Sequence, residues 1–140
     1  MISAMEQRVR HYWTLRSHDF GTVRKNELDN DMGQRWLCEL EKLLPDGKNL
    51  RILDVGTGTG FFAILLSQAG QRVEGIDLTP AMLSEAQEVA AQRGLSIVFR
   101  EMDAQALDYP DESFDVVLSR NLTWALPEPE KAYREWFRVL

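Results

Sequence analysis

From residue 50 onward, the chain alternates between short apolar runs and longer segments with helical spacing. Continuous apolar runs are typical of strands that are covered on both faces of a parallel sheet. Four such runs predict strands, at residues 52–55, 72–77, 96–100 and 115–119. Helices are predicted over residues 61–69, from Thr79-Pro80 onward and again from Pro129. Strands that alternate with helices predict an α/β fold with a parallel sheet and right-handed crossovers.

The first 47 residues have a different, purely helical pattern. A helix is predicted over residues 5–17, followed by a polar connection over residues 18–30 and a second helix over residues 31–44. Pro45-Asp46-Gly47 ends the second helix. Its start can be capped by one of three neighbouring residues, Asp29, Asn30 or Asp31. The chain is therefore divided into a helical segment, residues 1–47, and an α/β unit, residues 48–140.

The loop after the first strand carries three alternating glycines, Gly56, Gly58 and Gly60. Glycine lets the backbone turn tightly and approach a ligand, and the start of the following helix offers unpaired N–H groups. Asp77, 17 residues beyond Gly60, ends the second strand, where a carboxylate can accept both hydroxyls of a ribose. These features predict a nucleoside-binding βαβ unit.

The carboxyl ends of the predicted strands collect the polar residues of interest. Ligands of doubly wound sheets bind beyond these ends. The residues that fall there are Asp54, Asp77, Asp103 and Ser119. The sequence therefore predicts one binding rim for the whole sheet.

The glycine spacing disfavours a dinucleotide. The dinucleotide fingerprint is G-x-G-x-x-G, whose third glycine allows close helix packing beside the pyrophosphate. Here the third glycine comes one residue early, and Phe61 occupies the fingerprint position. A nicotinamide-dependent oxidoreductase of the Rossmann type stays as an alternative, as does an ordinary strand-to-helix turn without a ligand.

Four landmarks together resemble the class I S-adenosylmethionine (SAM) dependent methyltransferases of the small-molecule type. They are Asp-x-Gly-x-Gly-x-Gly at residues 54–60, the strand and helix start at residues 72–83, Asp103-Ala104, and the turn and strand at residues 111–119. The resemblance implies a Rossmann-like doubly wound sheet with strand order 3-2-1-4. It also implies methyl transfer from SAM to a small molecule, with S-adenosylhomocysteine (SAH) as the product.

The resemblance implies a role in cofactor binding for twelve residues. Gly56, Gly58 and Gly60 form the loop around the methionine part, and Asp54 orders this loop or binds the amino group. The other expected contacts are to the ribose (Asp77), the adenine (Leu78, Asp103 and Ala104), the sulfonium side (Arg120 and Asn121) and a lid (Tyr12 and Trp13). Residues 1–47 then form a helical lid, and residues 48–140 form the SAM-binding domain.

Several of these residues have a plain structural alternative. The aspartates can cap helices or turns, and Tyr12 and Trp13 can be buried by an amphipathic helix. No dedicated catalytic residue is predicted, because an in-line displacement mainly requires positioning. His11 and His18 are candidate bases, although we expect both to face solvent. No metal site is predicted.

The last helix leads to a further expectation. In the family, a helix ending in Arg-Val-Leu, as at Leu140, is followed by Lys-Pro-Gly-Gly and a fifth strand. The resemblance therefore implies a domain that stops before strands 5 to 7. The fourth strand, residues 115–119, would then be an apolar edge that is prone to pair with another chain. We expect marginal stability, oligomerisation or completion by a partner, and an inactive nucleoside-binding module is a further alternative.

The composition indicates which class of partner and which cellular compartment to expect. The net charge of −6 and the pI near 4.9 argue against a nucleic-acid backbone as the main partner, which favours a small molecule. No apolar run reaches the roughly 18 residues of a membrane span, and the N-terminus lacks the apolar core of a signal peptide. The single cysteine, Cys38, fits a reducing cytoplasm.

Overall fold

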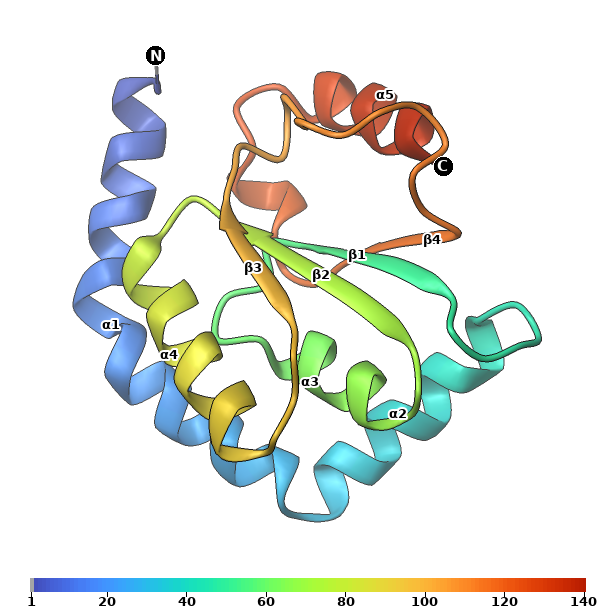
Figure 1. Ribbon diagram of the computed structural model, residues 1–140. Helices are drawn as coiled ribbons and strands as arrows, with labels where there is room; N and C mark the ends of the chain where they lie inside the picture. Colours follow the sequence, from blue (N-terminus) through green and yellow to red (C-terminus); the bar gives the residue numbers. More distant parts are fainter. Residues whose placement is uncertain (1) are drawn as a thin grey trace.

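The structure is a computed structural model that describes residues 2–140, and it contains a four-stranded sheet flanked by helices (Figure 1). The strands are β1 (Arg51–Val55), β2 (Arg72–Asp77), β3 (Val98–Glu101) and β4 (Val116–Ser119). The helices are α1 (Ala4–Leu28), α2 (Asp31–Leu43), α3 (Phe61–Gln68), α4 (Pro80–Gln92), α5 (Pro129–Val139) and a short 3-10 turn, η1 (Thr123–Ala125).

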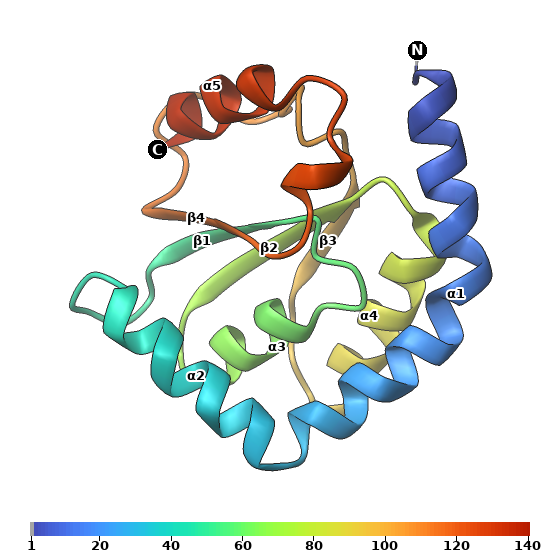
Figure 2. The ribbon, with the colours of Figure 1, turned by 180° about the vertical axis from the view of Figure 1, so that it is seen from behind.

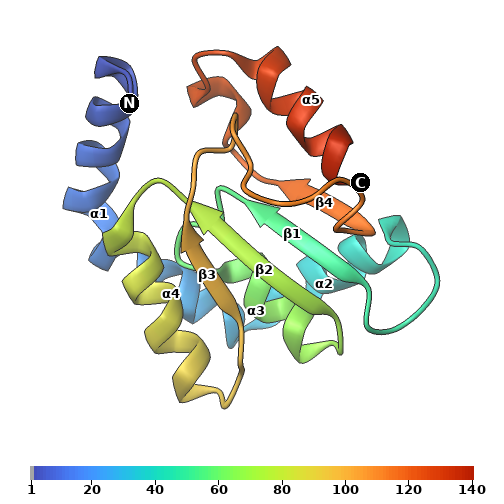
Figure 3. The same ribbon diagram turned by 45° about the horizontal axis from the view of Figure 1, so that its top comes forward.

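All neighbouring strands are parallel, and their order is β3-β2-β1-β4. This confirms the predicted α/β class and the 3-2-1-4 order. The register sets Asp54 beside Gly75 on one side and beside Leu118 on the other. The strand arrows all point toward the same edge of the sheet in Figure 3. The loops that follow β1, β2, β3 and β4 therefore meet at this edge.

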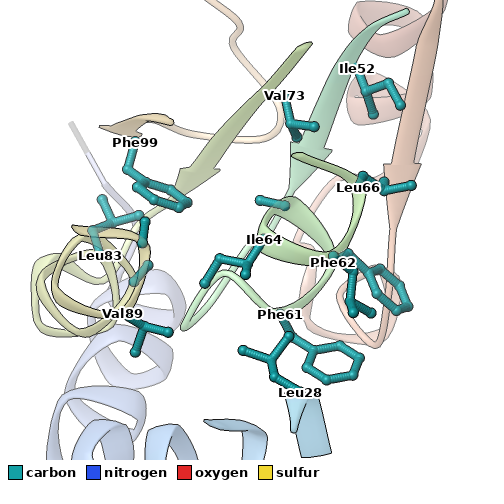
Figure 4. Close-up of a cluster of buried hydrophobic side chains, with 14 residues drawn as sticks. Leu28, Ile52, Phe61, Phe62, Ile64, Leu66, Val73, Leu83, Val89 and Phe99 are labelled. Carbon is teal, nitrogen blue, oxygen red and sulfur yellow. The ribbon is translucent and has the colours of Figure 1, made fainter. Parts of the chain in front are cut away.

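Helices cover both faces of the sheet (Figures 1 and 2). The crossover helices α3 and α4 pack on one face, with α1 and α2 outside them, and α5 lies on the other face. Side chains alternate along β1, so that Ile52 belongs to the core beneath α3 whereas Leu53 and Val55 belong to the core beside α5. Figure 4 shows the first core, in which Ile64 and Leu66 of α3 contribute to the cluster with the strand residues.

The N-terminal helix is longer than predicted. The sequence predicts a polar connection over residues 18–30, but α1 continues to Leu28. No proline interrupts this stretch, and α1 packs along α4. Gly21 allows the close approach, because a Cβ at this position would lie 3.3 Å from Glu85 Oε2. The helix is therefore stabilised by tertiary packing, which a polar local sequence does not reveal.

Other boundaries differ by a few residues. The third strand begins at Val98 and runs to Glu101, later than the predicted 96–100, and α2 ends at Leu43. Among the three possible caps of α2, Asn30 is the one that acts, because its side chain accepts the N–H of Met32 at 2.9 Å. Among residues 2–140, no helix combines the length and apolar character that crossing a membrane requires.

Candidate functional site

The loop between β1 and α3 turns at three glycines in left-handed conformations. Their φ angles are +70° at Gly56, +56° at Gly58 and +81° at Gly60, a region that side chains rarely adopt. A Cβ at Gly56 would lie 2.9 Å from the Leu122 side chain. A Cβ at Gly58 would meet only a Phe20 ring atom at 3.8 Å. Gly56 is thus required by packing, whereas Gly58 turns a bare backbone surface toward open space.

Asp77 connects this loop to the next helix. Its Oδ2 accepts the N–H of Gly58 and its Oδ1 accepts the N–H of Thr79, each at 2.9 Å. Each carboxylate oxygen keeps a further lone pair for another donor. The end of β2 therefore fixes the glycine loop and still offers two acceptors at the sheet edge.

Asp54 lies below the loop and is 3% exposed. Its Oδ2 accepts the Thr57 hydroxyl at 2.7 Å. Burial raises the pKa of Asp54 to about 7, and the nearby Asp77 carboxylate contributes in the same direction. Burial also raises the pKa of Asp77, while the N–H groups of Gly58 and Thr79 oppose that shift. The Asp77 carboxylate thus disfavours a negative charge on Asp54, so a cationic group beside the two carboxylates would be stabilised.

Two adjoining cavities open at this edge of the sheet. The main cavity, of about 150 Å³, is lined by Val9, Trp13, Phe20, Arg24, Asp54, Gly56, Thr57, Gly58, Thr59, Phe61, Phe62, Asp77, Thr79, Met82, Arg120, Asn121, Leu122 and Ala125. The side cavity, of about 50 Å³, is lined by Glu6, Val9, Gly56, Asp77, Leu78, Asp103, Ala104, Leu122, Ala125, Leu126 and Pro127. Asp77 and Gly56 belong to both walls, so the cavities form one divided site.

The side cavity brings together three predicted residues, Leu78, Asp103 and Ala104. It also contains a residue that the sequence analysis missed. Glu6 is 7% exposed, and its Oε1 accepts from Nε2 of Gln105 at 3.2 Å. Oδ1 of Asp103 accepts the backbone N–H of the same Gln105 at 2.8 Å. The first turn of α1 is therefore tied to the loop that carries Asp103.

The main cavity contains most of the other predicted residues, but not Tyr12. Trp13 forms part of the cavity wall, and the centroid of its ring lies 5.3 Å from the centroid of the Phe20 ring. Tyr12 is 46% exposed outside both cavities, where the Arg16 guanidinium lies 4.0 Å from its ring centroid. The structure thus separates the predicted pair, and Tyr12 is not buried in a core either. Gly60, the last glycine of the loop, was also predicted to bind the cofactor but lines neither cavity. It is the N-cap of α3, where a Cβ would lie 3.1 Å from the Phe99 ring.

The α1 residues in the main cavity have a helical spacing. Val9, Trp13, Phe20 and Arg24 lie four, seven and four residues apart and form one face of α1. The sequence contains this spacing, but it can be recognised only if the predicted helix is extended beyond residue 17. Phe20 and Arg24 were missed for that reason.

Polar atoms without partners also lie in this region. Among residues 2–140, the hydroxyl oxygens of Thr59 and Ser119 are buried and lack a hydrogen-bond partner. Ser119 ends β4 beside Val55, and Thr59 belongs to the glycine loop. His11 and His18 are exposed and line neither cavity. No cluster of potential metal ligands occurs in the described part of the chain.

The donor set suits a nucleoside that carries a positive charge. Carboxylates can accept hydroxyls and amines, free backbone of a glycine loop admits close contact, and apolar walls can cover a base or a methyl group. Phe61, which begins α3, occupies the place where a pyrophosphate would approach the helix. The geometry therefore fits an adenosine with a cationic substituent better than a dinucleotide.

Comparison with known proteins agrees with this geometry. The family model of a methyltransferase domain matches residues 53–140. Phosphatidylethanolamine N-methyltransferase of Cereibacter sphaeroides is 44% identical over 91 residues, which cover 64% of this chain and 44% of that protein. The chain thus spans less than half the length of this relative.

Solved structures show the same likeness. A SAM-dependent methyltransferase from Aquifex aeolicus superposes with a TM-score of 0.66 at 27% identity, covering 74% of this chain and 57% of that chain. The [4+2]-cyclase SpnF superposes with a TM-score of 0.72 at 32% identity, covering 76% of this chain and 40% of that chain.

Proposed function

The chain belongs to the class I SAM-dependent methyltransferases, and on this premise we propose that the whole protein transfers the methyl group of SAM to a small molecule. One observation carries the proposal. Asp77 lies on the wall that the two cavities share, and it holds the glycine loop through Gly58. A ribose at Asp77 can extend its base into one cavity and its substituent into the other.

We assign the side cavity to the adenine. Asp103 supplies a carboxylate for the exocyclic amine, Ala104 supplies backbone, and Leu78 packs on the base. The ribose hydroxyls bind Asp77, whose oxygens keep free lone pairs. This assignment makes Glu6 a neighbour of the adenine through Gln105.

The main cavity then holds the rest of the cofactor. Gly56 and Gly58 contact the methionine part, and Asp54 stabilises its amino group or orders the loop. Trp13 and Asn121 lie on the side of the sulfonium, where an aromatic face attracts a cation. The buried hydroxyl of Thr59, which lines this cavity, is a further donor that a ligand can satisfy.

Bound SAM supplies a methyl group on a positively charged sulfur. The residues of the chain hold donor and acceptor in line at reacting distance, which is the main requirement of such a displacement. The apolar walls formed by Phe20, Phe61 and Met82 exclude water. No general base is assigned, since neither histidine lines a cavity.

Two alternatives are less well supported. A dinucleotide would bring a pyrophosphate to the loop beside two carboxylates, Asp54 and Asp77, and to the helix start that Phe61 occupies. A module that binds the nucleoside without catalysis fits the same cavities. The likeness to a cyclase is one reason why turnover needs its own measurement.

The acceptor and the setting are also part of the proposal. A net charge of −6 favours a small molecule over a nucleic-acid backbone, and a single cysteine, Cys38, suits a cytoplasmic location. We assign residues 1–47 to a lid, because α1 forms a wall of both cavities. If no further strand follows β4 in the protein, this outer strand of the described sheet offers unpaired backbone for association with another strand, a proposal that a single monomeric species in sedimentation would contradict.

Calorimetric titration with SAH, with NADH as the control ligand, tests the cofactor assignment. We expect micromolar binding of SAH and none of NADH. Binding of NADH alone would overturn the assignment in favour of the oxidoreductase. A methyl-transfer assay on the full-length protein then separates an enzyme from a binding module, because only the enzyme converts SAM to SAH.

A further inference from the structure

Two arginines line the main cavity at the end away from the adenine residues. Arg24 comes from α1 and Arg120 directly follows β4. Their guanidinium carbons lie 5.9 Å and 5.8 Å from the centroid of the same Phe61 ring. Neither arginine lines the side cavity. Two cationic groups from distant parts of the sequence thus lie near the same aromatic ring in the wall of the cavity.

The two arginines differ in how their charge is balanced. Arg24 donates to Glu27 Oε2 at 2.6 Å, and its side chain is 16% exposed. Arg120 has no carboxylate within ion-pair distance among residues 2–140. Its guanidinium lies instead over aromatic rings, 4.5 Å from the centroid of Trp36 and 5.5 Å from that of Phe62. This end of the cavity therefore carries one uncompensated positive charge.

The environment of Arg120 is unfavourable for that charge. Burial lowers the pKa of Arg120, and the charge of Arg24 lowers it further, while the charge of Glu27 opposes the shift. Cation–π contacts recover part of the lost hydration, but the fork of N–H donors lacks an acceptor. An anion between the two arginines would supply charge-assisted hydrogen bonds in a site with little water.

We propose that Arg120, with Arg24 beside it, is the anion-binding end of the acceptor site, and that the acceptor is a small molecule with an apolar body and a carboxylate or phosphate group. The proposal rests on the proposed function, which sets the adenosine in the side cavity and at Asp77. The aromatic walls, including Phe20 and Phe62, suit an apolar body. The cofactor's own methionine carboxylate is the other source of an anion, and the experiment separates the two.

The first test uses benzoate and benzamide, which have the same shape and differ in charge. Both are titrated by ligand-observed NMR against the free protein and against the SAH-loaded protein. We expect benzoate to bind about tenfold or more tightly than benzamide, and Arg120→Gln to abolish the preference. Arg16→Gln is the matched control, since this arginine also stacks on a ring but lies outside the cavities. Equal binding of the two probes, or binding of neither, would overturn the proposal.

The second test decides the source of the anion. SAH carries the methionine carboxylate, and 5′-methylthioadenosine lacks the whole amino-acid part. If the acceptor supplies the anion, Arg120→Gln leaves the affinity for SAH within about twofold. A loss of about tenfold for SAH, with none for 5′-methylthioadenosine, would assign Arg120 to the cofactor and overturn the acceptor proposal. Arg120→Lys keeps the charge without the planar fork and is expected to retain part of the benzoate preference.

Failure of this inference and failure of the proposed function give different results. If the cofactor assignment is wrong, SAH does not bind, and if the protein only binds the nucleoside, SAH binds but the full-length protein transfers no methyl group. In both cases the benzoate preference of the free protein still tests whether Arg120 binds an anion. If only the inference is wrong, SAH binds normally and the two probes are not distinguished.

Discussion

The two ends of the main cavity hold opposite charges in different ways. At one end Asp54 and Asp77 are fixed by a hydroxyl and by backbone N–H groups at the ends of β1 and β2. At the other end, Arg24 of α1 and Arg120 of the loop after β4 lie over aromatic rings. Backbone hydrogen bonds fix the first end tightly, whereas stacked side chains can adjust. This contrast suggests that the carboxylate end holds the invariant cofactor and the arginine end adapts to the acceptor.

Filling the cavity beside the glycine loop at the carboxylate end should have the largest effect. A valine at Gly58 projects into the cavity from a left-handed backbone with φ of +56°. We expect Gly58→Val to weaken SAH binding by about a hundredfold, or about 3 kcal/mol, in calorimetry. Gly94→Val is the matched control, because Gly94 has a φ of +68°, lies outside both cavities, and a Cβ there would meet no atom within 4 Å. If both variants bind alike, the loop does not contact the ligand.

Neutralising the carboxylate end should have the next largest effect. Asp77→Asn keeps the shape and one acceptor for Gly58 or Thr79, but it removes the charge and half of the acceptors for the ribose. We expect SAH affinity to fall by about 1–3 kcal/mol. The exposed Asp19 on α1 provides the control, as Asp19→Asn. Unchanged affinity for SAH in Asp77→Asn would remove this residue from the site.

The carboxylate end should also give stability a pH dependence. Burial raises the folded-state pKa of Asp54 from 3.8 to about 7, so the folded protein binds this proton more tightly than the unfolded chain. Its contribution is fully present below the unfolded value and is lost as the pH rises toward 7. In urea unfolding, the free energy of unfolding should fall with a slope of up to about 1.4 kcal/mol per pH unit.

Asp54→Asn should flatten this slope without removing it. The raised pKa of Asp77 acts in the same direction and remains in the variant. Both proteins are unfolded in urea at several pH values between 3.8 and about 7, the unfolded and folded pKa values of Asp54. Identical slopes in the wild-type and variant proteins would show that Asp54 does not titrate in this range.

The smallest effect should distinguish two neighbouring aromatic residues of α1. Trp13 lines the cavity, whereas Tyr12 is exposed outside it. Trp13→Ala should weaken SAM binding by about threefold to tenfold, and SAM more than SAH, because only SAM carries the sulfonium charge. Tyr12→Ala should change neither affinity by more than about twofold. Equal losses for both variants would contradict the observed orientation of the helix.

The predictability of the two ends differs for physical reasons. The carboxylate end was predicted because buried parallel strands form continuous apolar runs, and because Gly56, Gly58 and Asp77 have local requirements that the sequence displays. The strand order was confirmed with them. These features depend on short stretches of chain, so a single sequence is sufficient to recognise them.

The arginine end depends on contacts between distant segments. Arg24 lies in a stretch predicted as a loop, whereas in the structure it belongs to α1, which packs along α4. Arg120 was predicted to line the cavity, but its stacking on Trp36 of α2 is a tertiary feature without a local signal. Tyr12 and Trp13 were predicted together from the resemblance, but adjacent residues of a helix point in different directions, so only Trp13 lines the cavity.

The continuity of α1 has a consequence for the timing of ligand exchange. The helix has 25 residues, is about 37 Å long, and forms part of the wall of both cavities. If the first turns of this continuous helix moved away from Gln105, Trp13 in the wall of the main cavity would move with them. On the proposed function, departure of the cofactor product and departure of the methylated acceptor would then depend on the same motion. The slower of the two steps would then set the pace for both.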